Sequence, residues 1–356
     1  MRTMSSSTSS SDKRMDGEKH SWLSFCVTYG VSLAVIVIGL VGLIYVIDPY
    51  DTGRSRMFER EGVRPQGPRT AAPSRIRDPQ FNAVIFGNSR TQLLSPERID
   101  AQTGLKFVQL SVPGSGPKEQ LAMLDWYLDR HPGETKAVVM SMDTFWCQAN
   151  PDLPPPNPFP FWLFEKDRLT YTSELLRYVA LQEMFQRFSY LNAKNPRKAR
   201  ADGYWDYEDE QKSNRTDEEI RRFVETSPAV VATHNDSGSY PAAVRLKEAA
   251  GRLSPDTVLI LYFPPVYIGS LVREGSSEAR QASECKAALQ QAAKSAHVRT
   301  LVLDWWKDRP ETHDAAGFFD QIHYRHPLAI RIEEDISAIL NRELAPDSAE
   351  NSSNRK

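Results

Sequence analysis

Three side chains that together could perform acyl transfer stand near opposite ends of this sequence. Ser89 follows a short apolar run and a glycine, whereas Asp320 and His323 stand three residues apart in the C-terminal part. A carboxylate that accepts a hydrogen bond from an imidazole fixes its tautomer, and the second ring nitrogen can then deprotonate a serine. These residue types predict Ser89 as nucleophile, His323 as general base and Asp320 as the residue that orients the base.

Each of the two motifs also has a simpler interpretation. Asn88 or Ser89 could serve only as a helix N-cap, and Asp320 and His323 could belong to a plain capping loop. His323 and His326 have a spacing that a metal site could use, but no further ligands cluster near them, so we expect no metal. We also expect no cofactor. The P-loop, the G-x-G-x-x-G fingerprint and the G-x-S-x-G elbow are all absent, which narrows the choice of fold.

Alternating strands and helices would position these residues. Apolar runs typical of buried strands cover 82–86, 107–112, 137–142, 257–263 and 298–303. Helical patterns separate or follow them at 95–102, 118–129, 240–253, 278–296 and 328–344. This alternation predicts an α/β protein with a three-layer, doubly wound parallel sheet. Since the carboxyl ends of parallel strands share one edge, Ser89 after the first strand and His323 after the last can meet there.

A long apolar segment precedes this domain. Residues 22–47 carry no charge, exceed the roughly 20 residues needed to cross a bilayer, and are not followed by a cleavage site, so we expect an uncleaved transmembrane anchor. The basic residues on its two sides do not decide its orientation. We therefore divide the chain into a disordered tail (1–21), the anchor (22–47), a juxtamembrane linker (48–78), the α/β domain (79–345) and a disordered tail (346–356).

The strand–helix pattern is interrupted at about 148–235. This region holds a loop rich in proline and aromatic residues (151–162), an amphipathic helix (171–191) and a polar, aromatic stretch (202–217). We expect an insertion over the carboxyl edge of the sheet. It is either a decorating subdomain or a lid that contacts the acceptor.

Charge and cysteine content narrow the function classes. A net charge of −2 and a pI near 6.4 do not suggest a nucleic-acid surface. Of the three cysteines, Cys147 and Cys285 could form a disulfide outside the cytoplasm, but buried free cysteines are the commoner case.

The two motifs carry a resemblance to a known superfamily. Gly87-Asn88-Ser89-Arg90, followed by Asp320-Gln321-Ile322-His323, resembles the SGNH (GDSL-like) hydrolases. With its membrane anchor, the chain is most similar to membrane-tethered periplasmic members, such as the D-alanyl transfer protein of teichoic acid modification and the alginate O-acetylation factors. The resemblance covers roughly 82–344 and leaves 148–235 unmatched.

The resemblance implies an oxyanion hole as well as a triad. Its donors would be the backbone amide of Ser89 and that of Gly114, with Gly116 as the other candidate. Many members place an asparagine after the third strand, where this chain has Asp143. An ionised carboxylate cannot donate a hydrogen bond to an oxyanion. Asp143 therefore either stays protonated, faces elsewhere, positions an acceptor hydroxyl, or is a helix cap.

The function that the resemblance implies is O-acyl transfer or ester hydrolysis on a cell-envelope polysaccharide, through an acyl-enzyme on Ser89. The chain would be a single-pass protein of the bacterial inner membrane with its domain in the periplasm. By the same resemblance, the acyl group would be acetyl and would come from a multi-pass membrane acyltransferase partner. A non-catalytic protein that binds or assembles envelope glycans is the main alternative, and a cytoplasm-facing enzyme is a third.

Overall fold

The computed structural model describes residues 10–58, 68–152, 158–194, 200–206, 208, 215–229 and 235–345, with side chains from residue 21 onward. The tail expected at 346–356 lies outside the described residues, as does the middle of the expected linker.

Five parallel strands form one sheet in the order β2–β1–β3–β4–β5, which confirms the predicted α/β class. This is one of the two common orders of doubly wound sheets, with its topological switch point between β1 and β3. The strands are β1 (Ala83–Gly87), β2 (Phe107–Ser111), β3 (Ala137–Ser141), β4 (Val258–Phe263) and β5 (Arg299–Asp304).

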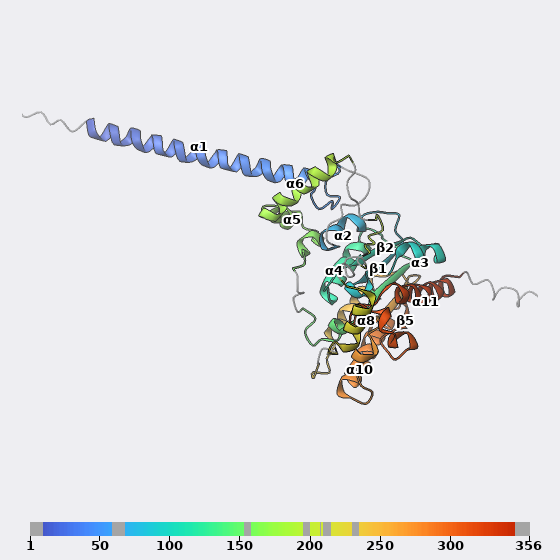
Figure 1. Cartoon of the computed structure of the whole chain (residues 1–356). Helices are drawn as coiled ribbons and strands as arrows, with labels where there is room; N and C mark the ends of the chain where they lie inside the picture. Colours follow the sequence, from blue (N-terminus) through green and yellow to red (C-terminus); the bar gives the residue numbers. More distant parts are fainter. Residues whose placement is uncertain are drawn as a thin grey trace, which may run out of the picture.

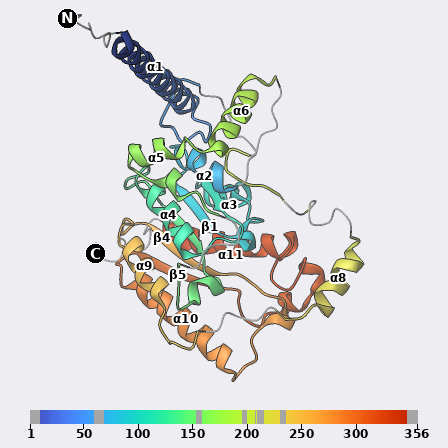
Figure 2. The same cartoon turned by 90° about the vertical axis from the view of Figure 1, so that its left-hand side faces the viewer.

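Helices cover both faces of this sheet and make three layers (Figures 1 and 2). In β1, Val84 and Phe86 join one apolar core, whereas Ala83 and Ile85 join the other, because successive strand residues point to opposite faces. The first core is closed by α4 (Pro117–Leu128), α9 (Pro241–Ala250) and α10 (Ser277–Lys294). The second is closed by α3 (Pro96–Thr103), α8 (Asp217–Thr226) and α11 (His326–Leu344).

Short 3₁₀ helices occupy many of the connections. They are η1 (Ser89–Thr91), η2 (Thr144–Cys147), η3 (Phe161–Phe164), η4 (Ile268–Ser270), η5 (Pro310–His313) and η6 (Ala315–Gly317).

A disulfide joins the connection after β3 to helix α10. Cys147 at the end of η2 is bonded to Cys285 in α10, across a sequence separation of 138 residues. The expectation that a buried free cysteine is the commoner case therefore does not hold for this pair. The fold places the two thiols side by side, which sequence spacing could not show.

The N-terminal helix α1 (Ser10–Ile47) is the one helix, within the described residues, that is long and apolar enough to cross a membrane. It begins at Ser10, so the expected disordered tail is wrong from residue 10 onward. Extending an existing helix adds one hydrogen bond for each residue fixed, so α1 continues into 10–21 although most of these residues are serine, aspartate, glycine or histidine, which are weaker helix formers.

The segment expected as a linker packs against the domain. Asp48 and Asp51 are buried, and α2 (Pro68–Ile76) is buried over most of its length. Asp51 accepts a hydrogen bond from Arg187 Nη2 at 3.2 Å, and Arg54 Nη1 donates to Leu163 O at 3.3 Å. The linker expectation is therefore wrong for the described parts of 48–78. Composition could not show this, since the partners are distant in sequence.

The insertion differs from expectation in two ways. The single helix predicted at 171–191 is two helices, α5 (Arg168–Glu174) and α6 (Tyr178–Asn192), with extended backbone at Arg177 between them. The break lets Tyr171 and Leu175 reach the same core as Ala180 and Met184. In addition, α6 contacts α1 and α5 contacts η3 (Figure 2), so these two helices do not cover the carboxyl edge. Within the described residues, α8 packs on η6, and its C-cap residue Ser227 accepts from Gln321 of the loop that carries Asp320. Asp206 and Glu208 of the insertion contact His326 just after the same loop.

Candidate active site

The turn that presents Ser89 is fixed by close packing at the end of β1. Ser89 opens η1, and Asn88 caps it by accepting a hydrogen bond from the Arg90 amide at 3.0 Å. The capping role that the sequence left open therefore belongs to Asn88. A Cβ atom on Gly87 would lie 2.2 Å from Thr91 Oγ1 and 2.8 Å from Ser141 Cβ, so glycine is required before this turn.

The structure brings the three predicted catalytic residues together. Ser89 Oγ lies 2.8 Å from His323 Nε2, and His323 Nδ1 lies 2.8 Å from Asp320 Oδ2. The second oxygen of Asp320 accepts hydrogen bonds from the amides of Ile322 and His323, both at 2.8 Å. The side chains of His323 and Asp320 are 26% and 38% exposed, so the site is open to solvent.

Asp320 is held in its ionised form. Burial alone would raise its pKa, but the hydrogen bond and positive charge of His323, together with two backbone amides, outweigh burial and lower the pKa below 3.8. A carboxylate that is ionised near neutral pH can accept a hydrogen bond from Nδ1–H and stabilise an imidazolium on His323.

The backbone donors predicted for an oxyanion hole are not equivalent. The Gly116 amide already donates to Glu119 Oε2 at 2.8 Å, in the capping box of α4, and is therefore engaged. Gly114 adopts φ +71°, a conformation that favours glycine, and within the described residues its amide has no hydrogen-bond acceptor. Its loop packs against the end of β1, because Val112 N and Ser115 Oγ both donate to Gly87 O. Gly114 is therefore the better candidate.

Asp143 is a buried structural residue at the switch point. It is 2% exposed; one oxygen accepts from the Phe145 amide at 2.9 Å and the other from Asn88 Nδ2. Burial raises its pKa, although Arg90 and these hydrogen bonds oppose the shift. Both oxygens are engaged, so Asp143 caps η2 and holds Asn88 rather than facing an acceptor hydroxyl.

Arg90, the residue after Ser89, has a structural role that could not be predicted from the sequence. It is buried, and its Nη2 donates to Pro264 O at 2.9 Å and to Pro265 O at 2.8 Å, in the loop after β4. Burial lowers its pKa, whereas the charge of Asp143 opposes this shift. Arg90 therefore joins the Ser89 turn to a loop from the other half of the sheet.

Gln321 performs a similar task on the other side of the triad. Its side-chain amide donates to Val224 O and Ser227 O of the insertion, and its oxygen accepts from Ser270 Oγ at 2.8 Å. The loop that carries Asp320 and His323 is thereby held between α8 and η4.

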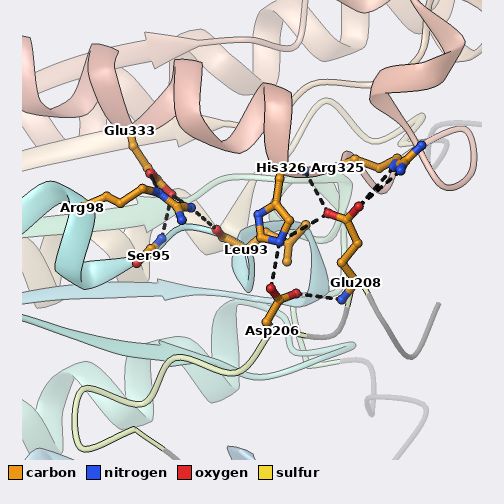
Figure 3. Close-up of polar contacts among 8 residues, drawn as sticks. All are labelled: Leu93, Ser95, Arg98, Asp206, Glu208, Arg325, His326 and Glu333. Carbon is orange, nitrogen blue, oxygen red and sulfur yellow. Dashed lines mark hydrogen bonds and ion pairs between the residues drawn. The ribbon is translucent and has the colours of Figure 1, made fainter. Parts of the chain in front are cut away.

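The two histidines considered as a metal pair have separate partners. His326 Nε2 contacts Asp206 Oδ2 at 2.8 Å and Glu208 Oε2 at 3.3 Å (Figure 3), whereas His323 faces Ser89 and Asp320. In the same figure, Glu333 of α11 accepts from the Ser95 amide at 2.7 Å and from Arg98. These contacts fix the start of α11. The described residues hold no group of three or more His, Cys, Asp or Glu suited to a metal ion.

No family model matches the chain, and no curated protein matches it. Any functional assignment therefore depends on the geometry of Ser89, His323 and Asp320.

Proposed function

We propose that this protein is a membrane-anchored SGNH-type serine O-acyltransferase or esterase. One observation carries the proposal, namely the continuous hydrogen-bonded chain from Ser89 Oγ through His323 to Asp320. The three groups come from the loops after the first and the last strand. They meet at the edge of a doubly wound sheet where ligands commonly bind.

The chemistry follows from these contacts. With Nδ1 protonated and donating to Asp320, His323 Nε2 accepts the Ser89 proton while Oγ attacks the carbonyl carbon of an ester. The oxyanion then points toward the amides of Ser89 and Gly114. As the tetrahedral intermediate collapses, His323 returns the proton to the departing alcohol, and the acyl group stays on Ser89. A second cycle, in which His323 deprotonates water or a sugar hydroxyl, releases or transfers the acyl group.

The proposed setting is the periplasmic side of a bacterial inner membrane, with an envelope polysaccharide as acceptor. Two observations support it. Helix α1 has the length and composition of a membrane anchor, and the Cys147–Cys285 disulfide is of the kind that persists in oxidising compartments. Acetyl is the proposed acyl group, and a multi-pass membrane acyltransferase is the proposed donor partner, both by resemblance alone.

Reaction with a fluorophosphonate probe tests the nucleophile. We expect the full chain in detergent to be labelled covalently and labelling to be lost in Ser89→Ala. Ser115→Ala is a matched control, because Ser115 is a buried neighbouring serine that donates to Gly87 O; this variant should still be labelled. A wild-type protein that takes no label and hydrolyses no small acetyl ester would contradict the catalytic proposal.

One observation favours the non-catalytic alternative. The side-chain amide of Asn88 donates its hydrogen bond to Asp143 and is not available to an oxyanion. The candidate oxyanion donors named above are therefore all backbone amides. Removing one such donor can cost about 10²–10³-fold in rate. A folded wild-type protein that retains an envelope polysaccharide on an affinity column but remains unlabelled would favour this alternative.

A further inference from the structure

Helices α5 and α6 of the insertion carry a group of exposed apolar side chains. Each of them is more than half exposed: Leu169, Leu176, Tyr178, Val179, Phe185 and Phe188. We call this group the α5–α6 surface. Large exposed apolar side chains gathered on one part of a soluble protein commonly mark an interaction site.

The outward face of α6 is also devoid of charge. Of its eight exposed positions, four are apolar or aromatic and four are uncharged polar residues. The two charged residues of the helix, Glu183 and Arg187, are partly and fully buried. A helix that faces water normally carries its charged residues on the outer face, so the distribution on α6 is the reverse of the ordinary one.

This surface is held rigidly against the end of α1. Tyr171 of α5 packs edge-on against Tyr45 of α1, with the ring centroids 6.0 Å apart, and its hydroxyl lies 3.4 Å from Asp48 Oδ1. Arg187 of α6 donates to Asp51 Oδ1 at 3.2 Å. Figure 1 shows α5 and α6 on the side of the domain from which α1 extends.

The length of α1 places the membrane surface close to this junction. Its apolar part covers 27 residues, about 40 Å at 1.5 Å per residue, against a hydrocarbon core of about 30 Å. The last turns of α1, which α5 and α6 contact, therefore lie in the interfacial region. The side chains of Lys166 and Arg177, 74% and 64% exposed, flank the same surface and form ion pairs with Asp129 and Glu174. Basic residues at this depth are attracted to anionic lipid headgroups.

We propose that the α5–α6 surface lies in the headgroup region of the bilayer that α1 crosses, as a second, interfacial attachment. The proposal rests on the membrane anchoring proposed above. It assigns the insertion the task of fixing the orientation of the domain on the membrane, in addition to tethering it. Interfacial helices bury their apolar face by about 5–10 Å, a depth suited to Phe185 and Phe188.

Site-directed spin labelling of the full chain in phosphatidylcholine–phosphatidylglycerol nanodiscs tests this. In a Cys26→Ser background, nitroxides are placed singly by Phe185→Cys, Phe188→Cys, Val35→Cys and Val244→Cys. Val35 lies within the apolar part of α1, whereas Val244 is an exposed apolar residue of α9, which lies away from α1 in Figure 2. Relaxation by oxygen, which concentrates in lipid, is compared with relaxation by a water-soluble nickel chelate.

We expect the oxygen-to-nickel ratio at positions 185 and 188 to exceed that at 244 several-fold and to approach that at 35. If position 35 is lipid-exposed but 185 and 188 resemble 244, the interfacial attachment is wrong while the anchor stands. If 185 and 188 are shielded from both reagents, a protein covers the surface and the lipid proposal is wrong. A water-exposed label at 35 would overturn the anchor and this inference together, without affecting the fluorophosphonate result.

Discussion

The two carboxylate oxygens of Asp320 have separate tasks. Oδ1 accepts from two backbone amides and shapes the loop, whereas Oδ2 accepts from His323 Nδ1. An asparagine at this position can still accept the amide protons, but its NH₂ group would face Nδ1. Because this NH₂ group donates a hydrogen bond, Nδ1 would have to accept it, and the imidazole proton would sit on Nε2. Nε2 could then no longer accept the proton of Ser89.

Asp320→Asn should therefore lower the rate of fluorophosphonate labelling by about 10³–10⁴-fold, as expected for the wrong tautomer in a serine triad. The folded-state pKa of Asp320 is depressed, so the ionised carboxylate stabilises the fold above the ordinary carboxyl pKa. That contribution is lost as the pH falls through the depressed value.

The same substitution thus has a pH signature that denaturant unfolding can measure. The difference in unfolding free energy between wild type and Asp320→Asn should be largest at pH 6–7 and shrink toward zero below the ordinary value of 3.8. A difference that stays constant from pH 7 to pH 3 would show that the ionised carboxylate adds no stability.

At the scale of elements, the junction between β1 and η1 depends on the absence of a side chain at Gly87. Gly87→Ala brings a methyl group into contact with Thr91 and Ser141, and such overpacking costs about 1–3 kcal/mol. Because Thr91 belongs to η1, its displacement should also move Ser89 and slow labelling.

A double-mutant cycle with Thr91→Ala checks this explanation. Thr91→Ala alone removes the hydroxyl that donates to Asn88 O, but it also makes room for the new methyl group. Measured by denaturant unfolding, the two substitutions together should cost less than the sum of the single costs. Additive costs would mean that the methyl group and Thr91 do not meet.

Much of this architecture could be predicted from the sequence. The apolar runs locate all five strands to within one residue at each end, because strands buried on both faces leave continuous apolar segments. The triad could be proposed from residue types and from the position of each residue after a strand. Arg90 and Gln321 could not be assigned, because their main partners are backbone carbonyls, which leave no sequence signal. The break between α5 and α6 could not be predicted either, because the apolar residues keep helical spacing across it.

At the scale of the whole molecule, the anchor and the triad lie toward opposite edges of the sheet. Helix α4 starts near the Ser89 turn and runs back, so that Tyr127 near its end donates to Phe81 O, just before β1. The neighbouring Trp126 packs against Phe164 and lies beneath Arg54, which follows α1. The amino edge therefore faces α1, and the triad opens away from it. Under the proposed function, a polysaccharide acceptor would approach from the aqueous side, and an acyl donor delivered through the membrane would have to reach past the domain.

The triad faces away from the membrane only if α1 is packed on the domain and not joined to it by a free linker. Substitutions at two adjacent residues of α1 distinguish these two arrangements. Ile44 is 2% exposed against the core, whereas Leu43, on a neighbouring face of the helix, is 48% exposed. In the full chain in detergent, Ile44→Ala should lower the unfolding free energy of the domain by about 2–5 kcal/mol, as for other buried truncations to alanine. Leu43→Ala should change it by less than about 0.5 kcal/mol. Equal effects of the two substitutions would show that α1 is not packed on the domain, and the direction in which the triad faces would then no longer be fixed by the anchor.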